Sequence, residues 1–255
     1  MRGSTPHGTR SEQEAAEWVR AMFGRVAHRY DLANHLLSFN IDRYWRAHTM
    51  ARVRDVLVRP EARVLDICCG TGDLVRVLQG ARPTGVPGSQ VIGSDFCHPM
   101  LVAAQAKVSG PLFEADALNL PLPDASLDLI TVAFGFRNLA NYEAGLREMR
   151  RVLRGGGTAA ILEFSQPPNP LFGALYNLYS RRVLPLIGGA LSGSRDAYTY
   201  LPDSVRKFPA PEELADMMRA AGFGPVEFER LTGGIVALHL GSAQATASPL
   251  RSTAR

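Results

Sequence analysis

The hydrophobic positions near the start of the chain recur with helical spacing. Ser11 and Glu14 form a capping box of the kind that begins a helix. After it, one apolar stripe recurs every three or four positions: Trp18, Met22, Phe23 and Val26. Further helical patterns continue up to Pro60, the longest of them over residues 42–58. The pattern therefore predicts a helical N-terminal segment.

From residue 63 the pattern changes to short apolar runs that alternate with helical patterns. The run over residues 127–134 is nearly continuous, which is typical of a strand buried on both faces of a sheet. This alternation predicts an α/β fold with a doubly wound, mostly parallel sheet. A glycine-rich turn at residues 232–234 predicts a final hairpin, so that the sheet ends with one antiparallel strand. Seven strands are expected, over residues 63–67, 91–95, 112–115, 127–134, 158–164, 226–230 and 235–240.

The same pattern divides the chain into parts. Residues 1–11 are polar without periodicity and are expected to be disordered, as is the polar tail over 242–255. Residues 12–60 form a helical cap, and residues 61–241 form the α/β domain. Within that domain, residues 168–195 interrupt the alternation with an aromatic-rich apolar stretch, which predicts a helical insertion.

Composition adds information on the class of protein. Of the 255 residues, 46% are hydrophobic and 20% are charged, which excludes global disorder. No apolar run reaches about 18 residues, and the N-terminus has no apolar signal segment, so we expect neither a membrane span nor secretion. Three cysteines, two of them adjacent at Cys68 and Cys69, favour a reducing, cytoplasmic compartment.

Positive charge is concentrated in the N-terminal part of the chain. The formal net charge is +4, and residues 1–60 hold ten Arg against six Asp and Glu. Such a segment fits an anionic membrane surface, a nucleic acid or an acidic substrate, and it equally fits a solvated helix face. Because the sequence lacks an aromatic and basic RNA-binding motif, we expect no nucleic-acid partner.

A glycine turn after the first predicted strand carries the clearest chemistry. Asp66 is in this strand, while Gly70 and Gly72 allow a ligand to approach the backbone at the start of the next helix. Asp95 ends the second strand, where it can accept hydrogen bonds from two ribose hydroxyls. Val75 stands where a dinucleotide site has its third glycine, which weighs against a nucleotide-dependent dehydrogenase. A nucleoside without phosphates, such as S-adenosylmethionine, fits better.

Two groups of motifs resemble known methyltransferases. The first is similar to the class I S-adenosylmethionine-dependent methyltransferases: residues 64–72, Asp95, Asp116 with Ala117, and the glycine turn 155–157. The second resembles signatures of the ubiquinone/menaquinone biosynthesis C-methyltransferase family: residues 30–34 (YDLAN) with Ser38 and Trp45, 134–138 (FGFRN), 151–156 (RVLRGG) and 162–165 (LEFS). The resemblance extends from about Phe23 to Gly241, and the turn with Cys68 and Cys69 is closer to the menaquinone branch.

The resemblance implies a class I methyltransferase fold, S-adenosylmethionine as methyl donor and no metal. It implies cofactor contacts at five positions: Thr71, Asp95, Asp116, Ala117 and Ala133. The implied substrate is a demethylated prenyl-quinol, and demethylmenaquinol is the preferred candidate. The alternative is C-methylation of a quinol of the ubiquinone pathway. An RNA-binding methyltransferase is a further alternative, and it would show salt-dependent RNA binding. A homodimer is left open.

Methylation of a quinol ring carbon needs a group that stabilises the charge of the neighbouring phenolate. Arg137 follows the carboxyl end of the fourth predicted strand, and it is the predicted catalytic residue, with Asn138 placed to orient it. A long prenyl tail also implies contact with a membrane. The insertion carries apolar side chains around Arg181 and Arg182, as in a helix at a bilayer surface or beside a tail groove, although core packing is the alternative. We therefore expect a cytoplasmic protein with weak peripheral contact at the inner face of the membrane.

Overall fold

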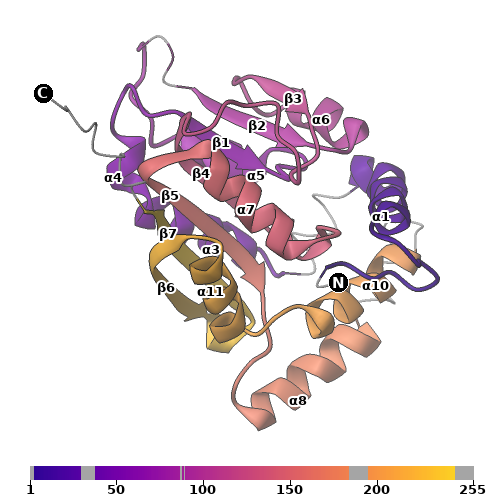
Figure 1. Cartoon of the computed structure of the whole chain (residues 1–255). Coiled ribbons are helices and arrows are strands. Elements are labelled where there is room, and N and C mark those ends of the chain that lie inside the picture. Colours follow the sequence, from indigo (N-terminus) through magenta and orange to yellow (C-terminus); the bar gives the residue numbers. More distant parts are fainter. Residues whose placement is uncertain (1–2, 30–37, 87, 89, 184–194, 245–255) are drawn as a thin grey trace, which may run out of the picture.

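A seven-stranded sheet runs through the middle of this computed structural model, which describes residues 3–29, 38–86, 88, 90–183 and 195–244 (Figure 1). The strand order is β3-β2-β1-β4-β5-β7-β6, and every pairing among the first five strands in this order is parallel. The predicted α/β class and mostly parallel sheet are therefore confirmed. The strands are β1 (Val64–Ile67), β2 (Val91–Asp95), β3 (Leu112–Glu114), β4 (Leu127–Ala133), β5 (Leu153–Phe164), β6 (Phe223–Leu231) and β7 (Val236–Ala243).

The last two strands form the predicted hairpin, but the antiparallel strand is not at the edge. β7 pairs antiparallel with both β5 and β6, so β6 is the outer strand. The burial of the two strands explains this order. Val236, Ala237 and Leu238 of β7 are at most 1% exposed, whereas exposed Glu227 and Arg230 interrupt the apolar positions of β6.

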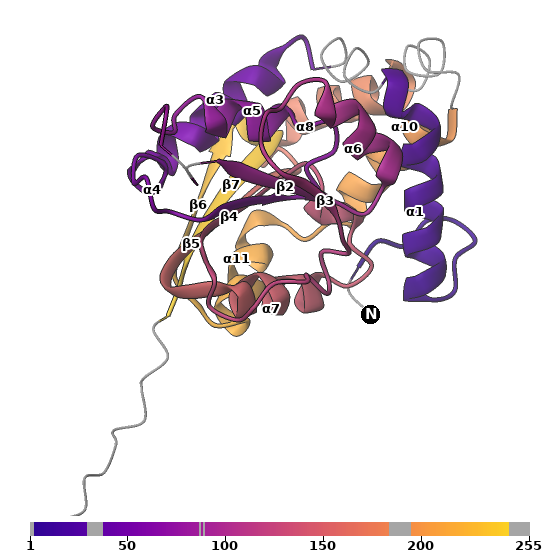
Figure 2. The ribbon, with the colours of Figure 1, turned by 90° about the horizontal axis from the view of Figure 1, so that it is seen from above.

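Helices cover both faces of the sheet. Figure 2 shows α3, α5 and α6 on one face and α7 and α11 on the other. The helix expected over residues 42–58 is divided at Val53 into α3 and α4, because the backbone of Val53 leaves the helical region. The α-helices are α1 (Glu12–Val26), α3 (Ile41–Arg52), α4 (Arg54–Leu57), α5 (Asp73–Gln79), α6 (His98–Gln105), α7 (Tyr142–Val152), α8 (Pro170–Leu178), α10 (Arg195–Lys207) and α11 (Pro211–Ala220).

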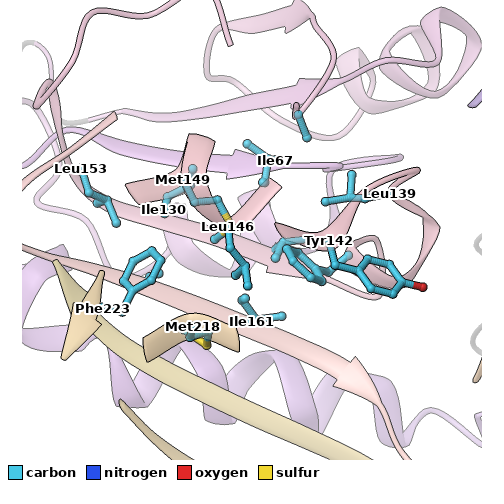
Figure 3. Close-up of a cluster of buried hydrophobic side chains, with 14 of the residues drawn as sticks. Ile67, Ile130, Leu139, Tyr142, Leu146, Met149, Leu153, Ile161, Met218 and Phe223 are labelled. Atoms are coloured by element: carbon cyan, nitrogen blue, oxygen red, sulfur yellow. The ribbon is translucent and has the colours of Figure 1, made fainter. Parts of the chain in front are cut away.

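Two buried clusters fill the space between the sheet and its helices. Consecutive residues Leu129 and Ile130 of β4 belong to opposite clusters, so this strand is buried on both faces, as its continuous apolar run predicted. The first cluster joins α7 and α11 to the sheet (Figure 3): Ile130, Leu146, Met149, Ile161 and Met218. The second joins α3, α4 and α5 to the other face: Trp45, Leu57, Leu74 and Leu78.

The N-terminal residues are more ordered than the sequence suggested. Ser11 caps α1 by accepting a hydrogen bond from the Glu14 N–H, as predicted. Residues 1–11 were expected to be disordered, but the structure places Ser4 and Pro6 of this segment in buried positions. Ser4 is 6% exposed, its hydroxyl lies 2.7 Å from the Tyr200 hydroxyl, and its N–H donates to the Leu139 carbonyl. Long-range contacts of this kind leave no periodic signal in the sequence.

The insertion and the C-terminal tail are described in part. The insertion is helical through α8 and a following turn of π-helix, η3 (Tyr179–Val183). Residues 184–194 of the expected insertion lie outside the described residues, as do residues 245–255 of the expected tail. β7 continues to Ala243, two residues into the segment that we expected to be disordered.

Candidate functional site

A pocket of about 910 Å³, partly open to solvent, lies at the carboxyl ends of β1 to β4. In doubly wound sheets, ligands bind outside the carboxyl ends of the strands at this kind of position. The loops that follow the four strands form its floor, and Ala16 and Phe23 of α1 and Arg46 of α3 line it from the helical cap.

The turn after β1 leaves its backbone open to this pocket. Gly70 and Gly72 have φ angles of +55° and +84°, in the left-handed region that favours glycine. A Cβ atom added to Gly70 would meet nothing within 4 Å, whereas one added to Gly72 would lie 2.8 Å from Cγ1 of Val108. Gly70 therefore leaves room for a ligand, and Gly72 lets α5 pack closely against the segment that follows α6.

A buried carboxyl group lies at the end of β2. Asp95 is 6% exposed and accepts hydrogen bonds from the N–H groups of Gly70 (2.8 Å) and Cys97 (2.9 Å). Burial raises the pKa of Asp95 to about 6, and these two hydrogen bonds oppose the shift. Each carboxylate oxygen accepts more than one hydrogen bond, so Asp95 keeps acceptor capacity toward the pocket.

A second acid, Asp66 of β1, also lines the pocket. It is 1% exposed and accepts a hydrogen bond of 2.5 Å from the Thr131 hydroxyl. Burial raises the pKa of Asp66 to about 7, opposed by this hydrogen bond and by the positive charge of Arg46. The sequence marked Asp66 as part of the glycine-turn motif, but not its burial or its pairing with Thr131.

The structure brings together all five positions at which the resemblance implied cofactor contacts. Thr71, Asp95, Asp116, Ala117 and Ala133 line this one pocket. Asp116 is exposed and accepts a hydrogen bond from the Leu118 N–H, which fixes the loop after β3, and Ala117 is buried. The motif at residues 30–34 lies outside the described residues.

Arg137 is not among the residues that line the pocket. Its side chain is 6% exposed, and its guanidinium pairs with Glu163 of β5 at 2.9 Å. The same guanidinium donates to the Phe134 carbonyl and to the Ser204 hydroxyl of α10. Asn138, one residue later, does line the pocket, and its Oδ1 accepts a hydrogen bond from Tyr200. Arg137 thus holds the segment after β4 from behind the pocket wall.

Several lining residues were missed by the sequence analysis. Phe23 belongs to the apolar stripe of α1, which predicted only packing, and Arg46 follows Trp45 of a family motif without having been singled out. Phe134 has a φ of +60°, and its ring lies 5.4 Å from the Arg46 guanidinium carbon. Only the fold brings these three side chains to one cavity, since they lie on α1, α3 and the turn after β4.

The two cysteines of the turn after β1 line the pocket as neutral thiols. Burial raises the pKa of Cys68 and of Cys69, and the neighbouring acids raise both further, so the thiols stay neutral. In the part of the chain that the structure describes, no group of three or more His, Cys, Asp and Glu side chains could hold a metal ion.

Comparison with known proteins gives consistent results. Residues 9–243 match the model of the ubiE/COQ5 methyltransferase family. The chain is 48% identical to the demethylmenaquinone methyltransferase of Thermus thermophilus, over 86% of this chain and 99% of that protein. It is 46% identical to the protein of the same name from Deinococcus radiodurans, over 90% and 94% of the two chains. It is 45% identical to the ubiquinone/menaquinone biosynthesis C-methyltransferase UbiE of Syntrophotalea carbinolica, over 88% and 93%.

Solved structures agree on the fold. A SAM-dependent methyltransferase from Thermotoga maritima superposes with a TM-score of 0.61 at 19% identity, covering 88% of this chain and 99% of that chain. Another from Aquifex aeolicus gives a TM-score of 0.52 at 17% identity, covering 75% and 88%. The chain has the class I fold that the sequence predicted. Together with the family match over almost its whole length, this shows that the chain belongs to the ubiE/COQ5 methyltransferase family.

Proposed function

We propose that the protein transfers a methyl group from S-adenosylmethionine to a ring carbon of demethylmenaquinol, which forms menaquinol. Relatives at 48% and 46% identity carry the name demethylmenaquinone methyltransferase, and they span nearly the same length. The ubiquinone pathway is the alternative, because the relative at 45% identity is named for both quinones.

The observation that carries this proposal is the pocket itself, whose polar groups match the parts of S-adenosylmethionine. Asp95 offers buried acceptors for a ribose diol, and the open backbone at Gly70 leaves room beside it. The loop with Asp116 and Ala117 supplies an acceptor and an apolar surface for an adenine ring. The residues present fit the donor.

S-adenosylmethionine supplies an electrophilic methyl group when it is bound, so the protein has to align the two substrates and exclude water. Ala16 and Phe23 of α1 line the pocket from the cap, which shields it from solvent on that side. Arg137 acts as a positioning residue in this proposal. Its guanidinium donates to the Phe134 carbonyl and pairs with Glu163, and these contacts hold the segment 134–138 in place.

A prenylated substrate calls for a membrane surface, and α8 offers a candidate. No helix among the described residues is long and apolar enough to span a membrane. Leu171, Leu175 and Leu178 of α8 are 82%, 64% and 56% exposed, and their spacing places them on one face of the helix. Exposed Phe39 lies near the end of α8, since its ring is 6.0 Å from that of Tyr179. We propose weak peripheral contact with lipid at this face.

The test is a methyl-transfer assay with purified protein in detergent micelles. Labelled S-adenosylmethionine is supplied with a reduced demethylated naphthoquinol or with a reduced demethylated benzoquinol, and the labelled product is identified by mass spectrometry. We expect label in the naphthoquinol ring, at a kcat/KM higher than for the benzoquinol. A higher kcat/KM for the benzoquinol would assign the protein to the ubiquinone pathway, and label in neither quinol would refute the proposed function.

A further inference from the structure

The order of the strands determines the order in which the lining residues follow one another along the pocket. Asp116 and Ala117 follow β3, Asp95 ends β2, and Asp66 lies on β1, next to β4. If adenine lies at the β3 loop and the ribose at Asp95, the remaining part of S-adenosylmethionine extends toward β1 and β4. That part is an α-amino acid, with one ammonium and one carboxylate group. This end of the pocket therefore has to bind both signs of charge.

A buried cation lies at this end. Arg46 of α3 lines the pocket and is 7% exposed. Its guanidinium carbon lies 5.4 Å from the centre of the Phe134 ring, which belongs to the turn after β4. Its positive charge acts on the nearby Asp66 and lowers the pKa of that acid against the larger effect of burial. A cation and an acid thus lie close together where the amino-acid group is expected.

Arg46 keeps donors for a ligand. Its Nη1 is paired with Asp42 one turn earlier on α3, and its Nη2 lies 3.7 Å from Asp73, beyond hydrogen-bond distance. Lys107 lies closer to Asp73, at 3.1 Å, and neutralises it. A guanidinium carries five N–H donors in a planar fork that matches a carboxylate. The ion pair with Asp42 fixes the orientation of this fork without using all of it.

We propose that Arg46 binds the carboxylate of the methionine group of S-adenosylmethionine; this rests on the proposed function only as far as the methyl donor is concerned. Asp66, beside it, faces the ammonium group. The two residues make the protein selective for adenosyl ligands that retain the whole amino acid, because a ligand without the carboxylate leaves the buried guanidinium without that partner.

The test compares two ligands by calorimetry. S-adenosylhomocysteine has the amino-acid group, whereas 5′-methylthioadenosine has the same adenosine and sulfur without it. We expect Arg46→Gln to weaken the binding of S-adenosylhomocysteine about 10- to 100-fold. The affinity for 5′-methylthioadenosine should stay within about twofold of its original value. Arg46→Lys keeps the charge and should lose less. Equal weakening of both ligands, or weakening of neither, would overturn the proposal.

Removing Arg46 also leaves the buried carboxylate of Asp42 without this ion pair, which can lower stability. The double variant Asp42→Asn with Arg46→Gln removes both charges. It should melt closer to the original protein and still show the selective loss of S-adenosylhomocysteine. Recovery of that affinity in the double variant would contradict the proposal. Because the readout is binding, it stays separate from the proposed function: an intact protein that binds both ligands but methylates no quinol would refute only the latter.

Discussion

Two buried acids make the pocket sensitive to pH. Burial raises the pKa of Asp66 from 3.8 to about 7 and that of Asp95 to about 6, so the folded chain holds protons that the unfolded chain releases. Stability from these groups is therefore greatest below about pH 4 and falls as the pH rises toward 7. As the pH rises through these values the two acids ionise, and their carboxylates become available to bind a ligand.

The first prediction concerns Asp66→Asn in the ligand-free protein. Asparagine keeps an oxygen that can accept from Thr131 and removes the buried charge. At pH 8 we expect the free energy of unfolding of the variant to exceed that of the original protein by on the order of 2 kcal/mol. Near pH 4 we expect the two free energies of unfolding to be equal. Urea denaturation at both pH values measures this. A variant less stable at pH 8 would contradict the burial effect.

The second prediction concerns Asp95, which combines a structural role with the expected ribose contact. Asp95→Ala removes the acceptor and should weaken the binding of S-adenosylhomocysteine by about 1–3 kcal/mol, because the buried hydroxyls of the ligand then lack a partner. Asp95→Asn keeps the shape and one acceptor and should lose less. Calorimetry gives the affinities, with melting curves as a control, since Asp95 also holds the N–H groups of Gly70 and Cys97. Unchanged affinity would move the ribose elsewhere.

At the scale of elements, the segment after β4 is held by a buried polar network. Arg137 joins it to Glu163 of β5 and to Ser204 of α10, and Tyr200 of α10 reaches Asn138 in the pocket wall. This arrangement connects the helix after the insertion to the site. Ser4 joins the same network through its contact with Tyr200, which ties the N-terminal segment to α10.

The third prediction separates two roles of Arg137. Arg137→Gln should lower kcat by a larger factor than it lowers the affinity for S-adenosylhomocysteine, because the pocket wall near the reacting groups is displaced. If Arg137 only positions that wall, the pH dependence of kcat keeps its shape. If the guanidinium instead stabilises the phenolate directly, the acid limb of the profile moves to higher pH in the variant. A measured shift of that limb would restore the catalytic role that the sequence suggested.

Arg137→Gln leaves the buried Glu163 without its ion pair to Arg137, so this variant is expected to be destabilised by about 3–5 kcal/mol. The double variant Arg137→Gln with Glu163→Gln therefore serves as the control for folding. It should recover part of the stability, as measured by urea denaturation, so that its pH profile can be compared at a temperature where both proteins are folded.

The elements differ in how well the sequence predicted them, and the difference has a physical cause. The glycine turn and the strand–helix alternation were visible because they depend on neighbours within a few positions. The site acids of β1 and β2 followed from this alternation. The place of β7 between β5 and β6 depends on which strand of a hairpin is more buried. The surroundings of Arg137 depend on Glu163 and Ser204, which are 26 and 67 positions away, and no local pattern reports such distances.

At the scale of the whole molecule, the leucines of α8 differ in exposure from the aromatic residue beside them. Leu171, Leu175 and Leu178 are largely exposed, whereas Phe172 is partly buried against Gly233 of the turn between β6 and β7. The sequence suggested that this stretch is either a lipid surface or core. The exposed leucines and the partly buried Phe172 lie on different faces of one helix, so variants can test the two roles independently.

The last prediction uses this separation in a liposome co-sedimentation experiment. The double variant Leu171→Ser with Leu175→Ser removes apolar side chains from the exposed face, so it should bind vesicles less than the original protein and melt at the same temperature. Phe172→Ser is the matched control, because it leaves a cavity beside Gly233 and should lower the melting temperature while vesicle binding changes less. The net charge of +4 adds attraction to anionic lipid, so binding should be stronger on anionic than on neutral vesicles and should weaken with salt. Absence of binding to both kinds of vesicle would refute membrane contact through α8, and equal binding by the leucine variant would place the contact on another face.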